Sequence, residues 1–335
     1  MNAQLQEKCE QVVRNHELLY KKMIWEAGSN DVAIMASFIL ASMGIDADPD
    51  RYTECKKILK NNVNIFSEFR GIGEAMVITK MTLKDDPEAY LKGCLEVYKK
   101  LRDIHKLTAS PYMVMAAITI YEKGGLEHAD ENIAKLEELY KEERAIHPLL
   151  INDMDRGYLS MIITHCSDHR TVSAEIERCY DQAKDLSWID KDAIHSMAQV
   201  MSLSDKPAEQ KVELVRALLD GLKVAKHPAS KTYGLPALAA FSLLDMSPET
   251  IVPEIAEAAD YLKQQKGFKW YSVDARTRVM YASLLVFMAH VGVDDMSLAG
   301  SISSTLAMVL VEQLIMLLII VSVSASRAAA SSSSN

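Results

Sequence analysis

The chain has 335 residues, and its 49% hydrophobic content excludes a disordered chain. Only 13 glycines and 9 prolines interrupt it, which excludes a turn-rich all-β fold. The 37 basic and 46 acidic side chains give a net charge of -9, which works against binding to a nucleic-acid backbone.

The cysteines and the N-terminus predict a reduced, intracellular setting. The five cysteines are odd in number, scattered along the chain, and form no CxxC pair. The stretch from Met1 to Glu10 is polar and lacks the apolar segment of a secretory signal. We therefore expect a cytoplasmic protein.

Helical periodicity dominates from Gln4 onward. An N-terminal helix is expected within residues 1–30, followed by an array of helical pairs over residues 31–290. In each pair the first helix is rich in small and apolar residues, and the second is more charged. The first helices are expected at 31–43, 72–81, 111–121, 156–165, 193–201, 235–244 and 276–290. A serine N-cap followed by proline, as at Ser110-Pro111 and Ser247-Pro248, marks two of the helix starts.

A ring-bearing residue recurs just beyond each second helix, at intervals of 39 to 43 residues: Phe66, His105, His147, Trp188, His227 and Trp270. One helical pair cannot bury its apolar face alone, so neighbouring pairs stack into one core. The sequence therefore predicts an all-α fold: an α-solenoid-like array of about six helical pairs with a period of ~41 residues, plus an apolar C-terminal helix.

These six rings are candidate binding residues, and they have two interpretations. They could line one edge of a concave groove, where aromatic and imidazole rings would bind an extended partner. Alternatively, each ring fills the gap between one second helix and the next first helix. We favour this packing role, because stacked units need a recurring filler whether or not a ligand binds.

Metal-ligand residue types gather in the segment His165-Cys166-Ser167-Asp168-His169. His165, Cys166 and His169 could hold zinc with one more ligand from elsewhere in the chain. No second CxxC or HxxxH cluster completes the site, and a histidine in a last helical turn also suits the helix dipole. We therefore expect no stoichiometric metal and no cofactor.

No catalytic constellation is recognisable. Acidic pairs such as Glu142-Glu143 and Asp153 with Asp155 are typical of solvated helix ends. No serine lies in a GxSxG elbow, and no cysteine has a family signature around it. We therefore assign no catalytic residues.

The C-terminal part differs in kind from the array. Residues 291–303 are expected to form a connector, 304–325 an apolar helix and 326–335 a low-complexity tail. The stretch from Leu306 to Val323 is almost wholly apolar but contains Glu312. At ~1.5 Å rise per residue it is marginal for a hydrocarbon core of ~30 Å. We expect it to be buried or to self-associate, and membrane insertion is the alternative.

Three features of the whole chain point to one family. They are the block from Ser110-Pro111-Tyr112 to Ala116-Ala117, the recurring charged second helices, and the apolar tail that runs into Ala328 to Ser334. In these features the chain resembles an uncharacterised family from Gram-positive bacteria, domain of unknown function number four thousand and three. The resemblance implies an all-helical bacterial protein and carries over no activity or site.

The predicted function is a non-enzymatic helical-repeat scaffold that binds a protein or peptide. The prediction rests on extended surface, acidic charge and the lack of a catalytic constellation. The alternative is a helical-repeat enzyme or metal-binding protein that uses His165, Cys166 and His169. The segment from Leu306 to Val323 could add self-association or membrane contact, and no nucleic-acid partner is expected.

Overall fold

The computed structural model describes residues 1–23, 29–65, 67–71, 73–104, 110–166, 169–187, 190–232, 234–291, 310–311 and 314–315. Within these ranges all regular structure is helical, and no strand is present, so the all-α prediction is confirmed. Two short 3-10 helices, Glu68–Arg70 and Ala240–Leu243, accompany the α-helices.

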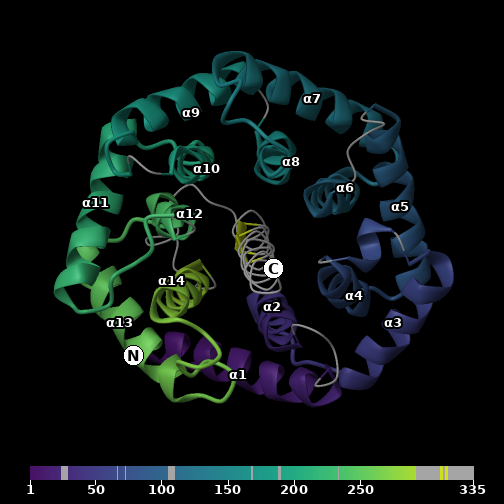
Figure 1. The fold of residues 1–335 in the computed structure, drawn as a ribbon, viewed down its shortest axis with the longest axis horizontal. Coiled ribbons are helices and arrows are strands. Elements are labelled where there is room, and N and C mark those ends of the chain that lie inside the picture. The colour runs from purple at the N-terminus through teal and green to yellow at the C-terminus, as the bar shows by residue number, and fades with distance from the viewer. Residues whose placement is uncertain are drawn as a thin grey trace, which may run out of the picture.

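The α-helices form two concentric rings (Figure 1). The outer ring consists of α1 (Ala3–Met23), α3 (Pro49–Asn62), α5 (Pro87–Ile104), α7 (Ala129–Ile146), α9 (His169–Ala183), α11 (Ala208–Val224) and α13 (Pro248–Gln264). The inner ring consists of α2 (Ser29–Ser42), α4 (Glu74–Thr82), α6 (Pro111–Gly124), α8 (Asp155–His165), α10 (Lys191–Met201), α12 (Leu235–Ala239) and α14 (Ala275–Val291). The chain alternates between the rings from one helix to the next.

The two ends of the array meet, so the helices form a closed ring, a closure that the predicted α-solenoid-like array did not specify. Each outer helix contacts the next, and α13 contacts α1, which also packs on α14. Polar contacts fasten this junction. Asn2 donates a hydrogen bond to Glu254 on α13 at 2.6 Å, the Met1 ammonium pairs with Glu257, and His290 of α14 lies 2.6 Å from Glu254.

Composition explains which helices are inside. The inner helices are covered on all sides: every residue from Ala193 to Met201 in α10 and from Thr277 to His290 in α14 is buried. A helix that is apolar all round belongs in a core, whereas one charged face suits a helix at the surface. The small, apolar first helices therefore form the inner ring, and the charged second helices form the outer one.

Local capping fixes several helix starts. Asp48 accepts hydrogen bonds from the backbone amides of Asp50 and Arg51 at the start of α3. Ser110 accepts one from the Met113 amide at 3.2 Å, which confirms the N-cap predicted before Pro111. Ser247 precedes Pro248 in the same way but makes no side-chain cap bond. Proline alone marks the start of α13.

Four residues of the C-terminal segment are described, and all four are buried. Leu310, Val311, Leu314 and Ile315 are 0 to 4% exposed and belong to the hydrophobic core. Figure 1 shows this part of the chain, in yellow, inside the inner ring. The rest of the predicted helix over 304–325, the connector beyond Val291 and the tail lie outside the described residues. None of the described helices is long and apolar enough to cross a membrane.

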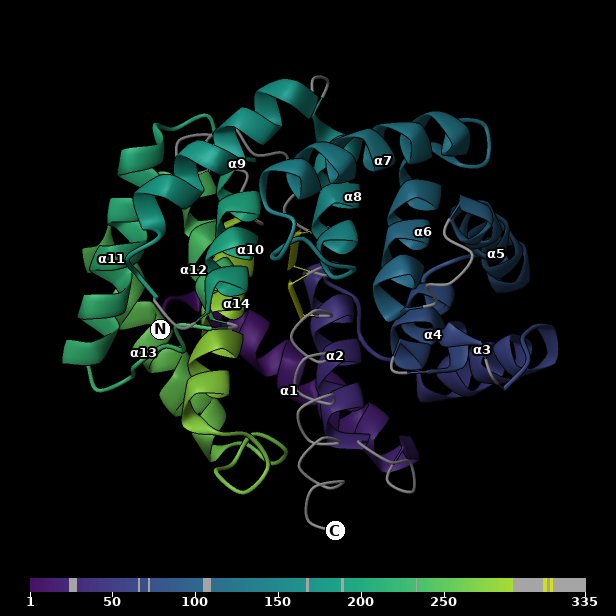
Figure 2. The same cartoon turned by 45° about the horizontal axis from the view of Figure 1, so that its top comes forward.

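The connections at one end of the inner helices form a distinct rim. The inner helices are seen end-on in Figure 1, while Figure 2 shows them turned. Because an outer helix returns the chain after each of them, they run parallel and their N-terminal ends share one side. We call the described residues that lead into these ends the N-terminal rim: 63–65, 67–71, 73, 110, 147–154, 184–187, 190, 225–232, 234 and 265–274.

Candidate metal centre at the N-terminal rim

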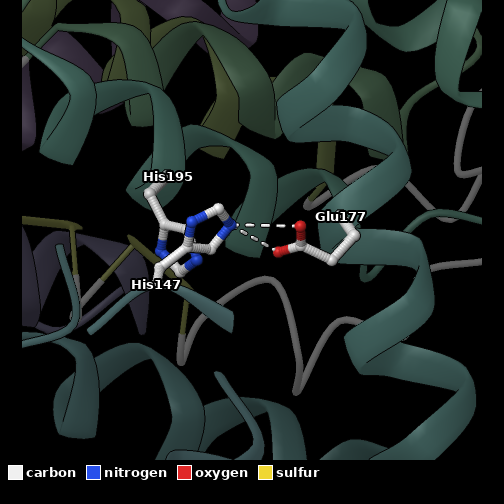
Figure 3. A group of neighbouring side chains, drawn as sticks. All are labelled: His147, Glu177 and His195. Carbon is white, nitrogen blue, oxygen red and sulfur yellow. Dashed lines mark hydrogen bonds and ion pairs between the residues drawn. The ribbon is translucent and has the colours of Figure 1, made fainter. Parts of the chain in front are cut away.

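Three potential metal ligands converge at this rim from three elements. His147 directly follows α7, Glu177 lies on α9, and His195 lies near the start of α10. One donor atom from each lies within 4.8 Å of the others, and within the described residues no other group of this kind is found. Figure 3 shows the two imidazoles and the carboxylate turned toward one another. We call these three residues the His-Glu-His cluster.

His147 and Glu177 form the more accessible side of the cluster. His147 Nε2 lies 2.8 and 3.1 Å from the two carboxylate oxygens of Glu177. The side chains are 17% and 25% exposed, so solvent reaches both. The His147 ring also packs against Tyr180, with centroids 4.8 Å apart, which restricts its rotation.

His195 forms the buried side, with 1% exposure. Its Nε2 lies 3.1 Å from Glu143 Oε2, and its Nδ1 lies 3.5 Å from Asp155 Oδ1. Burial alone lowers the pKa of His195, but the hydrogen bonds and charges of Asp155 and Glu143 outweigh it and raise the pKa to about 9. The two carboxylates therefore favour the protonated form of this ring.

The two carboxylates behind His195 are themselves held in place. Ser173 donates a hydrogen bond to Glu143 Oε1 at 2.5 Å, and Gln199 donates one to Asp155 Oδ1 at 2.8 Å. The backbone amide of Asn152 donates to Asp155 Oδ2 at 2.8 Å. These bonds fix the orientation of the carboxylates, and through them that of the buried imidazole.

Two imidazoles and a carboxylate in this arrangement suit two kinds of chemistry. They are the donor set that zinc and other divalent transition metals prefer. A histidine and a carboxylate in contact can also pass a proton. In both cases the reacting groups would be His147 and Glu177, whose side chains solvent reaches.

The family of the chain is now clear. A family model described as "Protein of unknown function (DUF4003)" matches residues 15–318. The chain belongs to this family. The match confirms the resemblance drawn from the sequence and spans the whole His-Glu-His cluster. Comparison with the curated proteins and with the solved structures gives no match.

The zinc ligands suggested by the sequence lie elsewhere in the DUF4003 chain. His165 and Cys166 line an open cavity of about 730 Å³ between α8, α9 and α11. His165 Nδ1 lies 2.9 Å from the Met161 carbonyl oxygen, and burial raises the pKa of the Cys166 thiol. The side chain of His169 lies outside the described residues. A site formed by these three residues stays a prediction.

The six predicted rings do not share one environment. Phe66, His105 and Trp188 lie outside the described residues. His147 belongs to the cluster, and His227 lies 3.5 Å from Asp260 on α13. Trp270 is 79% exposed and contacts the ring of Tyr271. The gap-filling interpretation therefore does not fit Trp270.

Sequence reasoning missed four residues of the site: Glu143, Asp155, Glu177 and His195. The acidic pairs that contain Glu143 and Asp155 were expected at solvated helix ends, yet these two side chains are 0% and 3% exposed. These side chains are buried because helices far apart in the sequence pack together: His195 and Glu143, which are in contact, are 52 positions apart. No short motif joins residues at such separations, so no local signal could have found the site.

Proposed function

We propose that this DUF4003 protein is a cytoplasmic, bacterial helical-repeat scaffold that binds a protein or peptide at the N-terminal rim. The proposed repeat unit is the pair of helices with a period of ~41 residues. The proposal adds a location to the predicted function, because the partner would contact the rim.

The distribution of exposed apolar side chains supports this proposal. Among the described residues, seven large apolar side chains are at least 49% exposed: Ile65, Ile104, Ile146, Leu149, Val224, Trp270 and Tyr271. Each lies on the N-terminal rim or is the last residue of an outer helix that enters it. The remaining exposed apolar side chains of the described chain reach at most 40%, as at Met43.

Apolar side chains gathered on one side of a protein are unfavourable in water and are typical of an interface. Exposed apolar residues scattered singly are normal, but a set gathered on one side marks an interaction surface. Trp270 and Tyr271 are the side-chain types that most often anchor protein interfaces, since each combines a large apolar ring with a hydrogen-bonding group. A protein partner with complementary apolar side chains would cover this surface.

A pair of matched variants tests the rim. We expect Trp270→Ser with Tyr271→Ser to lose a partner that wild-type protein captures by crosslinking in cells of its source. The control, Met43→Ser with Ile45→Ser, changes two less exposed apolar residues in the connection between α2 and α3, on the opposite rim, and should keep the partner. Equal capture by both variants would contradict the proposal. Capture of only the chain itself, or of lipid, would replace it with self-association or membrane contact.

A further inference from the structure

Three carboxylates gather at and beside the His-Glu-His cluster. Glu143, Asp155 and Glu177 contribute them. Within the described part of the chain, these carboxylates form ion pairs only with His147 and His195. Buried carboxylates are stabilised by cations or hydrogen bonds, and a cation at the cluster would add to the hydrogen bonds that Glu143 and Asp155 already accept.

The shell around His195 is of the kind that prepares a histidine to bind a metal. Asp155 lies beside Nδ1, which leaves Nε2 on the side of Glu143. A carboxylate behind the far ring nitrogen fixes the tautomer and orientation of metal-bound histidines. Gln199 holds this carboxylate in turn. The supporting residues therefore orient His195 as well as stabilise it.

We propose that His147, Glu177 and His195 bind one divalent transition-metal cation, with zinc as the type case, and that the carboxylate of Glu143 lies beside it. The inference goes beyond the proposed scaffold function. In a tetrahedral site with metal–nitrogen bonds of ~2.0 to 2.1 Å the donors lie ~3.4 Å apart, so the widest pair, now up to 4.8 Å apart, must close by roughly 1 to 1.5 Å. The half-exposed side chains of His147 and Glu177 can make that adjustment, while buried His195 stays fixed.

Access and donor type favour a transition metal over magnesium or calcium. Two of the three donors are imidazole nitrogens, which suit zinc, iron, cobalt or nickel, whereas magnesium and calcium prefer oxygen alone. The exposed side of the cluster would leave a position for water or for a group of a ligand. The site would thus be an open one, in contrast to closed structural zinc sites.

The test measures zinc binding by the full-length chain, purified without a polyhistidine tag or chelator. We expect one equivalent of zinc by calorimetry and elemental analysis, and a cobalt absorption band that reports nitrogen and oxygen coordination. His147→Ala and Glu177→Gln should each weaken zinc affinity at least tenfold. His227→Ala is the matched control, because His227 follows α11 as His147 follows α7, and it should bind as wild type.

Three results would overturn the assignment. They are no stoichiometric zinc in wild-type protein, unchanged affinity in both cluster variants, or a loss caused only by His165→Ala with Cys166→Ala. The last result would place the metal at the cavity between α8, α9 and α11. Circular dichroism of each variant separates loss of the site from loss of the fold. Binding of a partner at the rim is measured in a separate experiment, so the metal proposal can fail while the scaffold proposal stands, and the reverse.

Discussion

Charged side chains buried between the rings act at the scale of single residues, and Lys211 on α11 is one of them. It is 0% exposed, and its ammonium donates to Glu175 at 2.5 Å and to the carbonyl oxygens of Met201 and Ser204 at 3.0 and 3.1 Å. A lysine has three N–H donors, and here each has a partner. Lys211 thereby joins α11 to α9 and to the end of α10.

Replacing Lys211 should destabilise the fold strongly. Lys211→Ala removes the buried ammonium from Glu175, which keeps Arg178 as a partner, and from the two carbonyl oxygens, and breaking such a buried pair costs ~3 to 5 kcal/mol of unfolding free energy. Urea denaturation measures the change. Lys223→Ala, on the exposed face of the last turn of the same helix, should stay within ~0.5 kcal/mol of wild type. Similar effects at the two positions would contradict this role for Lys211.

The same pair predicts a dependence on pH. Burial alone raises the pKa of Glu175, but hydrogen bonds and charges from Lys211 and Arg178 outweigh it and lower the pKa. Because the folded-state pKa is below the unfolded value, this contribution is present above the usual glutamate pKa. It is lost as pH falls through the lowered folded-state value. The stability difference between wild type and Lys211→Ala should therefore be larger near neutral pH than in strong acid. A constant difference would contradict the account.

Some residue-level features can be predicted from sequence and others cannot. Ser110 and Met113 are three positions apart, so the cap between them is visible in a short window. His195 meets Glu143 and Asp155 only because α10 packs against the helices before it. Sequence patterns reveal only ligands that lie close together along the chain, so the predicted set was the short segment from His165 to His169. The His-Glu-His cluster can be recognised only once the packing of the helices is known.

Close packing between an outer and an inner helix sets a constraint at the scale of elements. Gly93 of α5 faces Tyr121 of α6, and a β-carbon at position 93 would lie 2.2 Å from the Tyr121 ring. A distance that short means that the ring or the helix must move. The glycine therefore sets how closely these two helices approach.

Two opposing effects decide the outcome of Gly93→Ala. Alanine in a helix interior is favoured over glycine by ~1 kcal/mol, whereas forcing an added group into a packed site costs ~1 to 3 kcal/mol. We expect net destabilisation, because the obstacle is the tyrosine ring itself. The double variant with Tyr121→Ala should remove the clash, and a double-mutant cycle in urea measures this coupling. Stabilisation by Gly93→Ala alone would show that the ring moves freely.

The C-terminal segment is the element whose place could be predicted least. Its apolar composition requires a cover, but composition alone leaves the array, a second copy and a bilayer as alternatives. Leu310 and Leu314 are buried in the core, so we expect this segment to help stabilise the two rings of helices.

A leucine pair tests that contribution. Leu310 is 0% exposed, so Leu310→Ala should lower the unfolding free energy by ~2 to 5 kcal/mol. Leu149 is 96% exposed, and Leu149→Ala should be nearly neutral. Urea denaturation of the two full-length variants compares them directly. Equal effects would show that the C-terminal residues add little to the core.

At the scale of the whole molecule, the fold class could be predicted and the closure could not. Helical periodicity and the alternation of apolar and charged helices are local properties, so they indicated an all-α array. An open array and a ring share that local pattern and differ in the small rotation from one pair to the next. Closure also depends on α1, which packs on α13 and α14, and on Asn2 just before it, which donates a hydrogen bond to Glu254, 252 positions along the chain.

A closed ring fixes the number of helical pairs and the timing of assembly. An open solenoid can gain or lose a unit at its end, whereas a unit removed from this ring leaves a gap of ~10 Å, about one helix spacing. Synthesis at ~5 to 20 residues per second separates the emergence of α1 from that of α13 by roughly 10 to 50 seconds. Throughout that interval the face of α1 that packs on α13 and α14 has no partner from its own chain. In the growing chain, that face therefore stays open to solvent until the last outer helix has been made.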